Sequence, residues 1–187
     1  MKRIAIFASG RGSNALKIID YLQNSGDQQV VTILSNNKES GVIESAIKLN
    51  IPYLAFERYD LYKSDLVLEH LKAHNIDYII LAGFMWLFPE ELLKHYPERV
   101  LNIHPALLPK YGGKGMYGLN VHREVLKHME AYSGITIHLV NSEYDKGRIL
   151  LQTKVRLNNS DSADDIAAKV LKLEHHFYPR LVASYCK

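Results

Sequence analysis

The sequence predicts an α/β fold: a single Rossmann-like domain with a mostly parallel central sheet, helices on both faces and a C-terminal antiparallel pair or edge strand. Three observations support this. Short apolar runs alternate with helically spaced segments, which is typical of βαβ units. A glycine-rich turn follows the first apolar run. After residue 105 the runs alternate apolar with polar, as antiparallel strands do. The 187 residues suffice for one core.

Five short runs up to residue 105 are expected to be buried strands, because their apolar residues are nearly continuous. They cover 3–8, 30–34, 52–56, 78–81 and 99–104. Segments with the spacing of amphipathic helices lie between these runs. They cover 15–22, 42–49, 61–73 and 89–96. The last begins on Pro89, because proline is favoured at the first position of a helix.

The second half begins with a glycine-rich loop over 107–120, and loops of this length usually serve function or move. A helix is expected over 121–129, followed by strands over 135–140 and 149–157 that flank a turn at 143–147. Ser162 caps a long helix over 163–177, which has acidic residues in its first turn. Pro179 is expected to interrupt the helical stretch that follows.

Composition excludes several classes of protein. Hydrophobic residues make up 47% and charged residues 23%, which is ordinary for a globular domain. The net charge of +3 is too small to indicate nucleic-acid binding, but it suits a small anionic substrate. The single cysteine excludes an internal disulfide and fits a reducing compartment. With no basic-then-apolar leader and no apolar run near about 18 residues, we expect a cytoplasmic protein without membrane contact.

Asn102 and His104 form the most informative pair. They are two residues apart on the fifth strand, so their side chains share one face of the sheet, about 7 Å apart. Pro105 has no N–H to give a sheet and ends the strand. Open α/β sheets bind ligands at such carboxyl ends. An amide beside an imidazole there suits a carbonyl that becomes an oxyanion, and a purely structural pair remains the alternative.

The turn Gly10-Arg11-Gly12-Ser13-Asn14-Ala15 matches the loose fingerprint G-x-G-x-x-G/A. Its glycines let the backbone approach a phosphate, and the following helix offers free N–H groups. A dinucleotide site also needs an acid after the second strand, where this sequence has Ser35-Asn36-Asn37. The better interpretation is a single phosphate held by Gly12, Ser13 and Asn14, with a plain tight turn as the alternative.

Other candidates are weaker on their own. Asp145 sits in a turn, where Asp usually bonds the backbone, but it could reach and orient His104. His138, on the strand before that turn, suits core packing or function equally well. The segment 85–88 could be core or could line the pocket of a flat aromatic ligand. Glu174 has a solvated helix face as its ordinary explanation. The nine histidines lack metal-ligand spacing, so no metal is expected.

Four segments line up in order: Gly-Ser-Asn, Ala-Gly-Phe-Met, Asn-Ile-His-Pro and an Asp turn followed by Gly. Together they resemble the phosphoribosylglycinamide formyltransferases, a family of the folate-dependent formyl-transfer superfamily, over essentially the whole chain. The resemblance implies one formyltransferase domain over 1–187, with a phosphate-binding half over 1–100 and a catalytic and folate-binding half over 101–187. The family uses 10-formyltetrahydrofolate as co-substrate and needs no metal.

The resemblance also implies roles for individual residues. The catalytic trio would be Asn102, His104 and Asp145. The phosphate and ribose of the substrate would be held by Gly12, Ser13, Asn14, Lys110 and Glu174. Folate would contact Met85, Trp86, Leu87, Phe88 and Asn102, with Arg58 as the candidate basic residue. The loop 112–118 is longer than in compact members of the family, so no folate contact is transferred to it.

The implied reaction is direct attack of the glycinamide amine on the formyl carbon, without a covalent enzyme intermediate. Asn102 and His104 would hold the oxyanion, and Asp145 would orient His104 and favour its charged form. Three alternatives stay open. They are a formyltetrahydrofolate hydrolase, a methionyl-tRNA formyltransferase, which would need an RNA-binding extension, and a non-catalytic Rossmann-type nucleotide-binding module. We expect small-molecule substrates only, and a monomer or homodimer.

Overall fold

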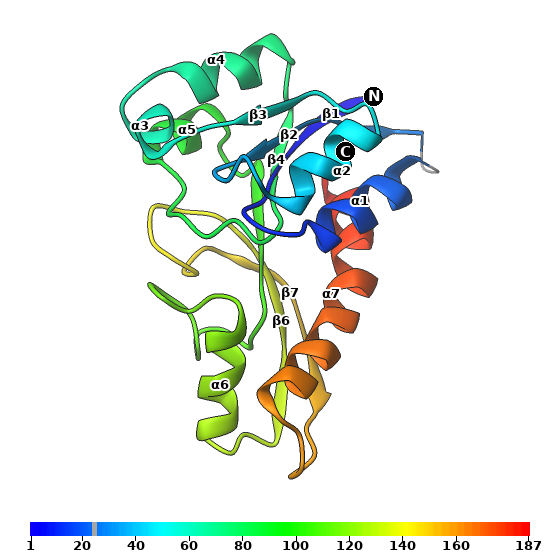
Figure 1. Ribbon diagram of the computed structural model, residues 1–187, viewed down its shortest axis with the longest axis vertical. Helices are drawn as coiled ribbons and strands as arrows, with labels where there is room; N and C mark the ends of the chain where they lie inside the picture. Colours follow the sequence, from blue (N-terminus) through cyan, green and yellow to red (C-terminus); the bar gives the residue numbers. More distant parts are fainter. Residues whose placement is uncertain (24–25) are drawn as a thin grey trace.

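The computed structural model describes residues 1–23 and 26–187 and shows one continuous seven-stranded sheet (Figure 1). The strand order is β3-β2-β1-β4-β5-β6-β7. The first five strands pair in parallel, whereas β6 is antiparallel to both β5 and β7. The bounds are β1 Lys2–Phe7, β2 Gln28–Ser35, β3 Tyr53–Ala55, β4 Tyr78–Leu81, β5 Val100–His104, β6 Tyr132–Leu139 and β7 Ile149–Arg156. The predicted fold class is confirmed.

Helices cover both faces of the sheet, because strand side chains alternate between two cores. On β1, Ile4 and Ile6 pack with α1, α2, α6 and α7, whereas Ala5 and Phe7 pack with α3, α4 and α5. The helix bounds are α1 Ser13–Gln23, α2 Gly41–Lys48, α3 Arg58–Tyr62, α4 Leu66–Ala73, α5 Glu90–His95, α6 Leu119–Lys127 and α7 Ala163–Tyr185. Pro89 caps α5 rather than starting it, and α6 begins two residues before its predicted start.

The single helix expected over 61–73 is wrong, because the structure has two helices, α3 and α4, separated at Lys63-Ser64-Asp65. The Ser64 hydroxyl donates to the Asp60 carbonyl and accepts from the Leu66 N–H. Serine side chains that bond the nearby backbone compete with helical hydrogen bonds. The apolar spacing continued across this break and concealed it.

The interruption expected at Pro179 is also wrong, because α7 runs without a break through this residue. Tertiary contacts hold the helix together here. The neighbouring Tyr178 is fully buried, and its hydroxyl donates to the carbonyls of Leu81 and Leu101 at 3.0 and 3.2 Å. One side chain thus anchors α7 to the ends of β4 and β5, and this compensates for the backbone bond that proline lacks.

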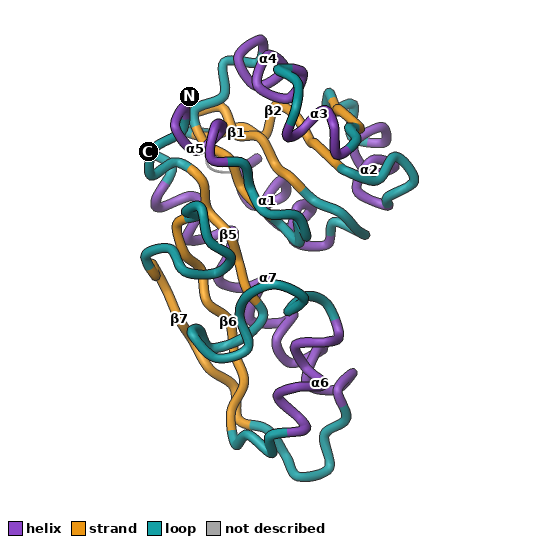
Figure 2. The backbone as a smooth tube through the Cα atoms, turned by 90° about the vertical axis from the view of Figure 1, so that its left-hand side faces the viewer, coloured by secondary structure: helices purple, strands orange, loops and turns teal. Residues whose placement is uncertain are grey.

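The two ends of the chain lie close together, as Figures 1 and 2 show from two directions. The Arg3 N–H donates to the Asp77 carboxylate at 2.9 Å, and the Tyr78 hydroxyl donates to the Lys187 carbonyl at 3.2 Å. Both ends therefore contact the start of β4. Among the described residues, no helix combines the length and apolar character that crossing a membrane requires.

Candidate active site

A cavity of about 860 Å³ opens at the carboxyl ends of β1, β4 and β5, and the chain after β6 closes one side of it. The sequence leaves β1 toward β2 on one side, and β4 occupies the other side of β1. A reversal of this kind separates the loops above the sheet and leaves a crevice where ligands bind. The fold therefore puts a binding site where the sequence places its polar residues.

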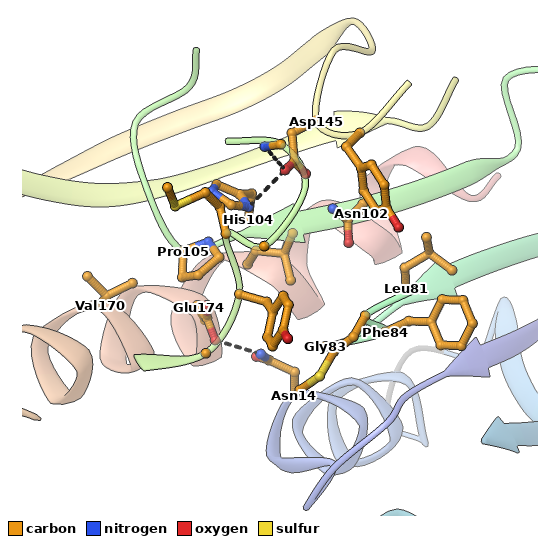
Figure 3. A pocket seen from close by; sticks show the side chains of 18 of the residues that line it. Asn14, Leu81, Gly83, Phe84, Asn102, His104, Pro105, Asp145, Val170 and Glu174 are labelled. Carbon is orange, nitrogen blue, oxygen red and sulfur yellow. Dashed lines mark hydrogen bonds and ion pairs between the residues drawn. The ribbon is translucent and has the colours of Figure 1, made fainter. Parts of the chain in front are cut away.

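Asn102, His104 and Asp145 converge on this cavity (Figure 3). Asn102 and His104 point into it from β5, and Asp145 reaches it from the turn after β6. The His104 Nδ1 lies 3.5 Å from the Asp145 Oδ2. The His104 Nε2–H donates to the Tyr111 carbonyl at 2.7 Å. The structure thus brings together three groups that the sequence carries on separate segments.

His138 connects two of these groups and was left undecided by the sequence. The antiparallel register sets it opposite Asn102, whose Nδ2 lies 3.1 Å from the His138 Nε2. The same Nε2 is 3.6 Å from the Asp145 Oδ1, and the His138 Nδ1–H donates to the Leu139 carbonyl. His138 therefore hydrogen-bonds Asn102 and lies beside Asp145. An amide nitrogen carries two hydrogens, so Asn102 keeps one for a ligand.

Burial and the neighbouring groups act in opposite directions on the pKa values of His104 and Asp145. Burial lowers the pKa of His104 below its usual value, and this outweighs the opposing effects of Asp145 and the Tyr111 carbonyl. Burial would raise the pKa of Asp145, but His138, the charge of His104 and the Gly113 N–H together lower it. Asp145 thus favours the charged form of His104, whereas burial favours the neutral form.

The turn after β1 lies at the same cavity. Ser13 and Asn14 line it, and the first turn of α1 presents its free N–H groups there. Gly12 adopts a φ of +76° and its carbonyl accepts from the Leu16 N–H, so it ends the turn and starts the helix. Arg11 also lines the cavity and adds a positive charge, which the sequence pattern alone did not single out.

Replacing Gly12 by Ala is expected to destabilise the protein by about 2–4 kcal/mol, because it combines backbone strain with overpacking. A Cβ at this position would lie 2.5 Å from the Val42 Cγ2, and φ is positive. Gly10→Ala is the matched control, since its Cβ would meet nothing within 4 Å. Urea unfolding of the two variants checks this. Equal stabilities would contradict the steric argument.

Asn14 and Glu174 join the first and last helices across the cavity floor. The Asn14 Nδ2 donates to the Glu174 Oε2 at 2.7 Å, and both side chains are nearly buried. Burial raises the pKa of Glu174, although the hydrogen bond from Asn14 opposes this. Within the described parts of the chain, the Asn14 Oδ1 has no hydrogen-bond partner. The pair can therefore offer both acceptors and donors to a hydroxyl-rich ligand, and Glu174 is not on a solvated face.

Met85, Trp86, Leu87 and Phe88 all line the cavity and form its aromatic wall. Arg58 does not line it. Its guanidinium lies 5.7 Å from the centre of the Trp86 ring, which places it behind that wall. Lys110 is also away from the cavity, where it forms an exposed ion pair of 2.8 Å with Glu130.

His122 is a further cavity residue that the sequence did not reveal. It lies in the first turns of α6 and is 5% exposed, and its Nδ1 has no hydrogen-bond partner among the described residues. Burial, and next the nearby His104, lower the pKa of His122 to about 4. The glycine-rich loop before α6 concealed its location, because loop geometry sets where this helix starts.

The lowered pKa of His122 predicts how stability changes with pH. In the unfolded chain the pKa of His122 is near its ordinary value of 6.5. Between pH 6.5 and pH 4 the unfolded chain therefore binds a proton that the folded protein does not bind. The contribution of neutral His122 to the free energy of unfolding is complete above pH 6.5 and is lost as the pH falls toward 4. Between about pH 7 and about pH 5 the wild type should lose about 2 kcal/mol more of its free energy of unfolding than His122→Leu does. Urea unfolding at both values checks this, and parallel pH profiles would contradict it.

No group of three or more His, Cys, Asp or Glu side chains that could hold a metal ion is found within 1–23 and 26–187. Among the described residues, the polar side chains that line the cavity include three amides, three imidazoles and four carboxylates, and the N-terminus of α1 and the aromatic wall lie beside them. This set can polarise a carbonyl, accept a proton and bind an anion.

Known proteins resemble this chain in sequence and in fold over most of its length. The family described as "Formyl transferase" matches residues 2–182. A chloroplastic phosphoribosylglycinamide formyltransferase from Arabidopsis thaliana is 42% identical over 192 residues, covering 100% of this chain and 66% of that protein. A cowpea (Vigna unguiculata) relative is 39% identical and is covered to 61%. The chain thus spans less than two thirds of these two plant proteins.

Bacterial relatives match nearer to full length. The Escherichia coli K12 phosphoribosylglycinamide formyltransferase is 35% identical over 186 residues, covering 96% of this chain and 85% of that protein. The crystal structure of glycinamide ribonucleotide transformylase 1 from Geobacillus kaustophilus superposes with a TM-score of 0.90 at 31% identity, and each chain is covered to 100%. Sequence and fold agree, and the chain belongs to the formyl transferase family.

Proposed function

We propose that this protein transfers the formyl group of 10-formyltetrahydrofolate to the amine of phosphoribosylglycinamide in purine synthesis. The observation that carries the proposal is that one cavity joins the trio of Asn102, His104 and Asp145 to the anion-binding turn at Ser13. Formyl transfer needs the first group, and a phosphorylated acceptor needs the second. The relatives named above carry this activity in their names.

The chemistry follows from the groups present. The acceptor amine attacks the formyl carbon and forms a tetrahedral intermediate with a negative oxygen. The free N–H of Asn102 stabilises that oxygen. A proton leaves the amine and reaches the folate N10 as the bond between N10 and carbon breaks, which gives a formamide and tetrahydrofolate. The Asp145 carboxylate stabilises the positive charge that develops on the attacking amine, and His104 can carry the proton between the two nitrogens.

His104 has a more limited role at rest than the resemblance implies. Its Nε2–H already donates to the Tyr111 carbonyl, and its Nδ1 faces Asp145. It can contact a substrate oxygen only after the Tyr111 carbonyl gives way. Tyr111 lies within the glycine-rich loop over 107–120, so a rearrangement of that loop would free His104 to contact the substrate.

An absorbance assay with 10-formyl-5,8-dideazafolate tests the proposal. Turnover is expected when glycinamide ribonucleotide is present and not when it is omitted. Formate release without the acceptor would instead identify a hydrolase. Affinity for NAD without any formyl transfer would identify a non-catalytic nucleotide-binding module.

We propose the cytoplasm, a reducing compartment, for this chain. The single cysteine, Cys186, supports it because it is buried and unpaired. The Arabidopsis and Vigna relatives are chloroplastic proteins by name. A monomer or homodimer stays a prediction, which light scattering of the purified protein can decide.

A further inference from the structure

The imidazole of His122 has no task in the chemistry described above, yet it lines the same cavity. It is 5% exposed, and its Nδ1 has no partner among the described residues. A buried polar atom without a hydrogen bond typically costs about 1–3 kcal/mol. A ligand that supplies a hydrogen-bond partner for the His122 Nδ1 would remove this cost, which explains why the cavity wall has an unpaired atom.

Two buried polar atoms without a hydrogen-bond partner belong to residues that line this cavity. In the part of the chain that the structure describes, the buried side-chain atoms without a partner are the following: Asn14 Oδ1, Asn36 Oδ1, His122 Nδ1, Ser133 Oγ and His175 Nε2. Of these, only the atoms of Asn14 and His122 belong to residues that line the cavity. Both lie on walls that a substrate would contact, so the two atoms are candidates for complementary groups of one ligand.

The location of His122 in the cavity indicates which part of a ligand it would contact. His122 and His104 line the same cavity, and the charge of His104 is one of the causes that lower the pKa of His122. It sits on α6, which packs against α7, the helix that carries Glu174. His122 therefore stands on the wall that leads from the catalytic trio toward the pair of Asn14 and Glu174.

The charge state of His122 narrows the ligand's chemistry. With a pKa of about 4 the ring is neutral at neutral pH, so it neither attracts an anion nor acts as an effective base. A neutral imidazole has one donor and one acceptor nitrogen. A secondary amide has the same two functions, and in the proposed substrate an amide links the ribose to the reacting amine.

We propose that His122 hydrogen-bonds the amide of the glycinamide arm and thereby holds the amine toward the formyl carbon. This inference rests on the proposed function and adds a residue that determines which acceptor is used. A phosphorylated ribose without the arm would still occupy the turn at Ser13 but would leave the Nδ1 of His122 unpaired.

The test compares His122→Leu, which removes both nitrogens, with His122→Asn, which keeps a polar group near the position of Nδ1. Glycinamide ribonucleotide and ribose 5-phosphate are titrated by calorimetry. For His122→Leu we expect Kd and KM for glycinamide ribonucleotide to rise about 10- to 100-fold. Ribose 5-phosphate affinity and KM for the formyl donor should stay unchanged. His122→Asn should remain within about threefold of the wild type, since it restores the hydrogen bond.

Stability separates this role from a structural one. His122→Leu should melt no lower than the wild type, because it removes an unpaired polar atom. His95→Leu, an exposed position on α5, is the matched control and should change neither binding constant. Equal losses for both ligands, or a lower melting temperature, would show a structural role and overturn the inference. The inference would also be overturned if His122→Leu bound glycinamide ribonucleotide with the affinity of the wild type.

Failure of the proposed function would look different. In that case the wild-type protein itself would neither bind glycinamide ribonucleotide nor formylate it. If the wild type is active and His122→Leu matches it in both constants, only the role of His122 is lost.

Discussion

Asp145→Asn is expected to lower turnover by roughly 10³- to 10⁴-fold while the protein stays folded. The carboxylate is the negative group that faces both His104, at 3.5 Å, and His138, at 3.6 Å. A neutral amide at this position cannot stabilise the positive charge that develops on the attacking amine. It can still accept the hydrogen bond from the Gly113 N–H, which measures 2.8 Å in the native protein. Steady-state kinetics and thermal melting check the two halves of this expectation.

A matched control for this variant is Asp65→Asn, which changes the same side chain at the start of α4, where it makes no capping bond. Its kcat should equal that of the wild type. The dissociation constant for glycinamide ribonucleotide should also stay within about threefold in Asp145→Asn, because the anion-binding turn is untouched. Near-native turnover in Asp145→Asn would exclude the carboxylate from the proton pathway.

Asn102→Ala is expected to lower kcat by about 10²- to 10³-fold, the usual effect of removing one donor to a developing oxyanion. The same change removes the partner of the His138 Nε2. The substrate KM should change little, because the lost interaction strengthens mainly in the transition state. Steady-state kinetics with both substrates checks the split between kcat and KM.

Asn102→Asp separates donation from packing. It keeps the shape of the side chain but replaces the N–H donor by a carboxylate where negative charge develops. Its kcat should fall at least as far as that of Asn102→Ala. If Asn102→Asp retained wild-type turnover, oxyanion stabilisation by this residue would be excluded.

Most of the sheet could be predicted because its strands are short apolar runs with clear ends. The four residues of β4 were found without error, since Gly83 follows them and a polar segment precedes them. The break between α3 and α4 was missed because apolar spacing continues through Ser64. Pro179 was misjudged because the anchoring hydroxyl of Tyr178 is a tertiary contact, and a local pattern cannot show it.

Part of the site could be predicted for a similar reason. Asn102 and His104 share one strand, so alternation alone puts them on one face. His138 depends on the register between β5 and β6, which the sequence does not specify. His122 depends on the path of a long loop. Lys110 belongs to a segment that resembles a cleft wall, but Glu130 holds its side chain on the outer surface.

The proximity of the two chain ends has a consequence for engineering. A short flexible linker could join residue 187 to residue 1, and new ends could be opened in the exposed turn at 158–160 between β7 and α7. The residues that line the cavity lie between 11 and 174, away from both of the joined residues. Such a circular permutant should keep its catalytic groups in register, since tertiary packing sets their arrangement and the order of the segments along the chain does not.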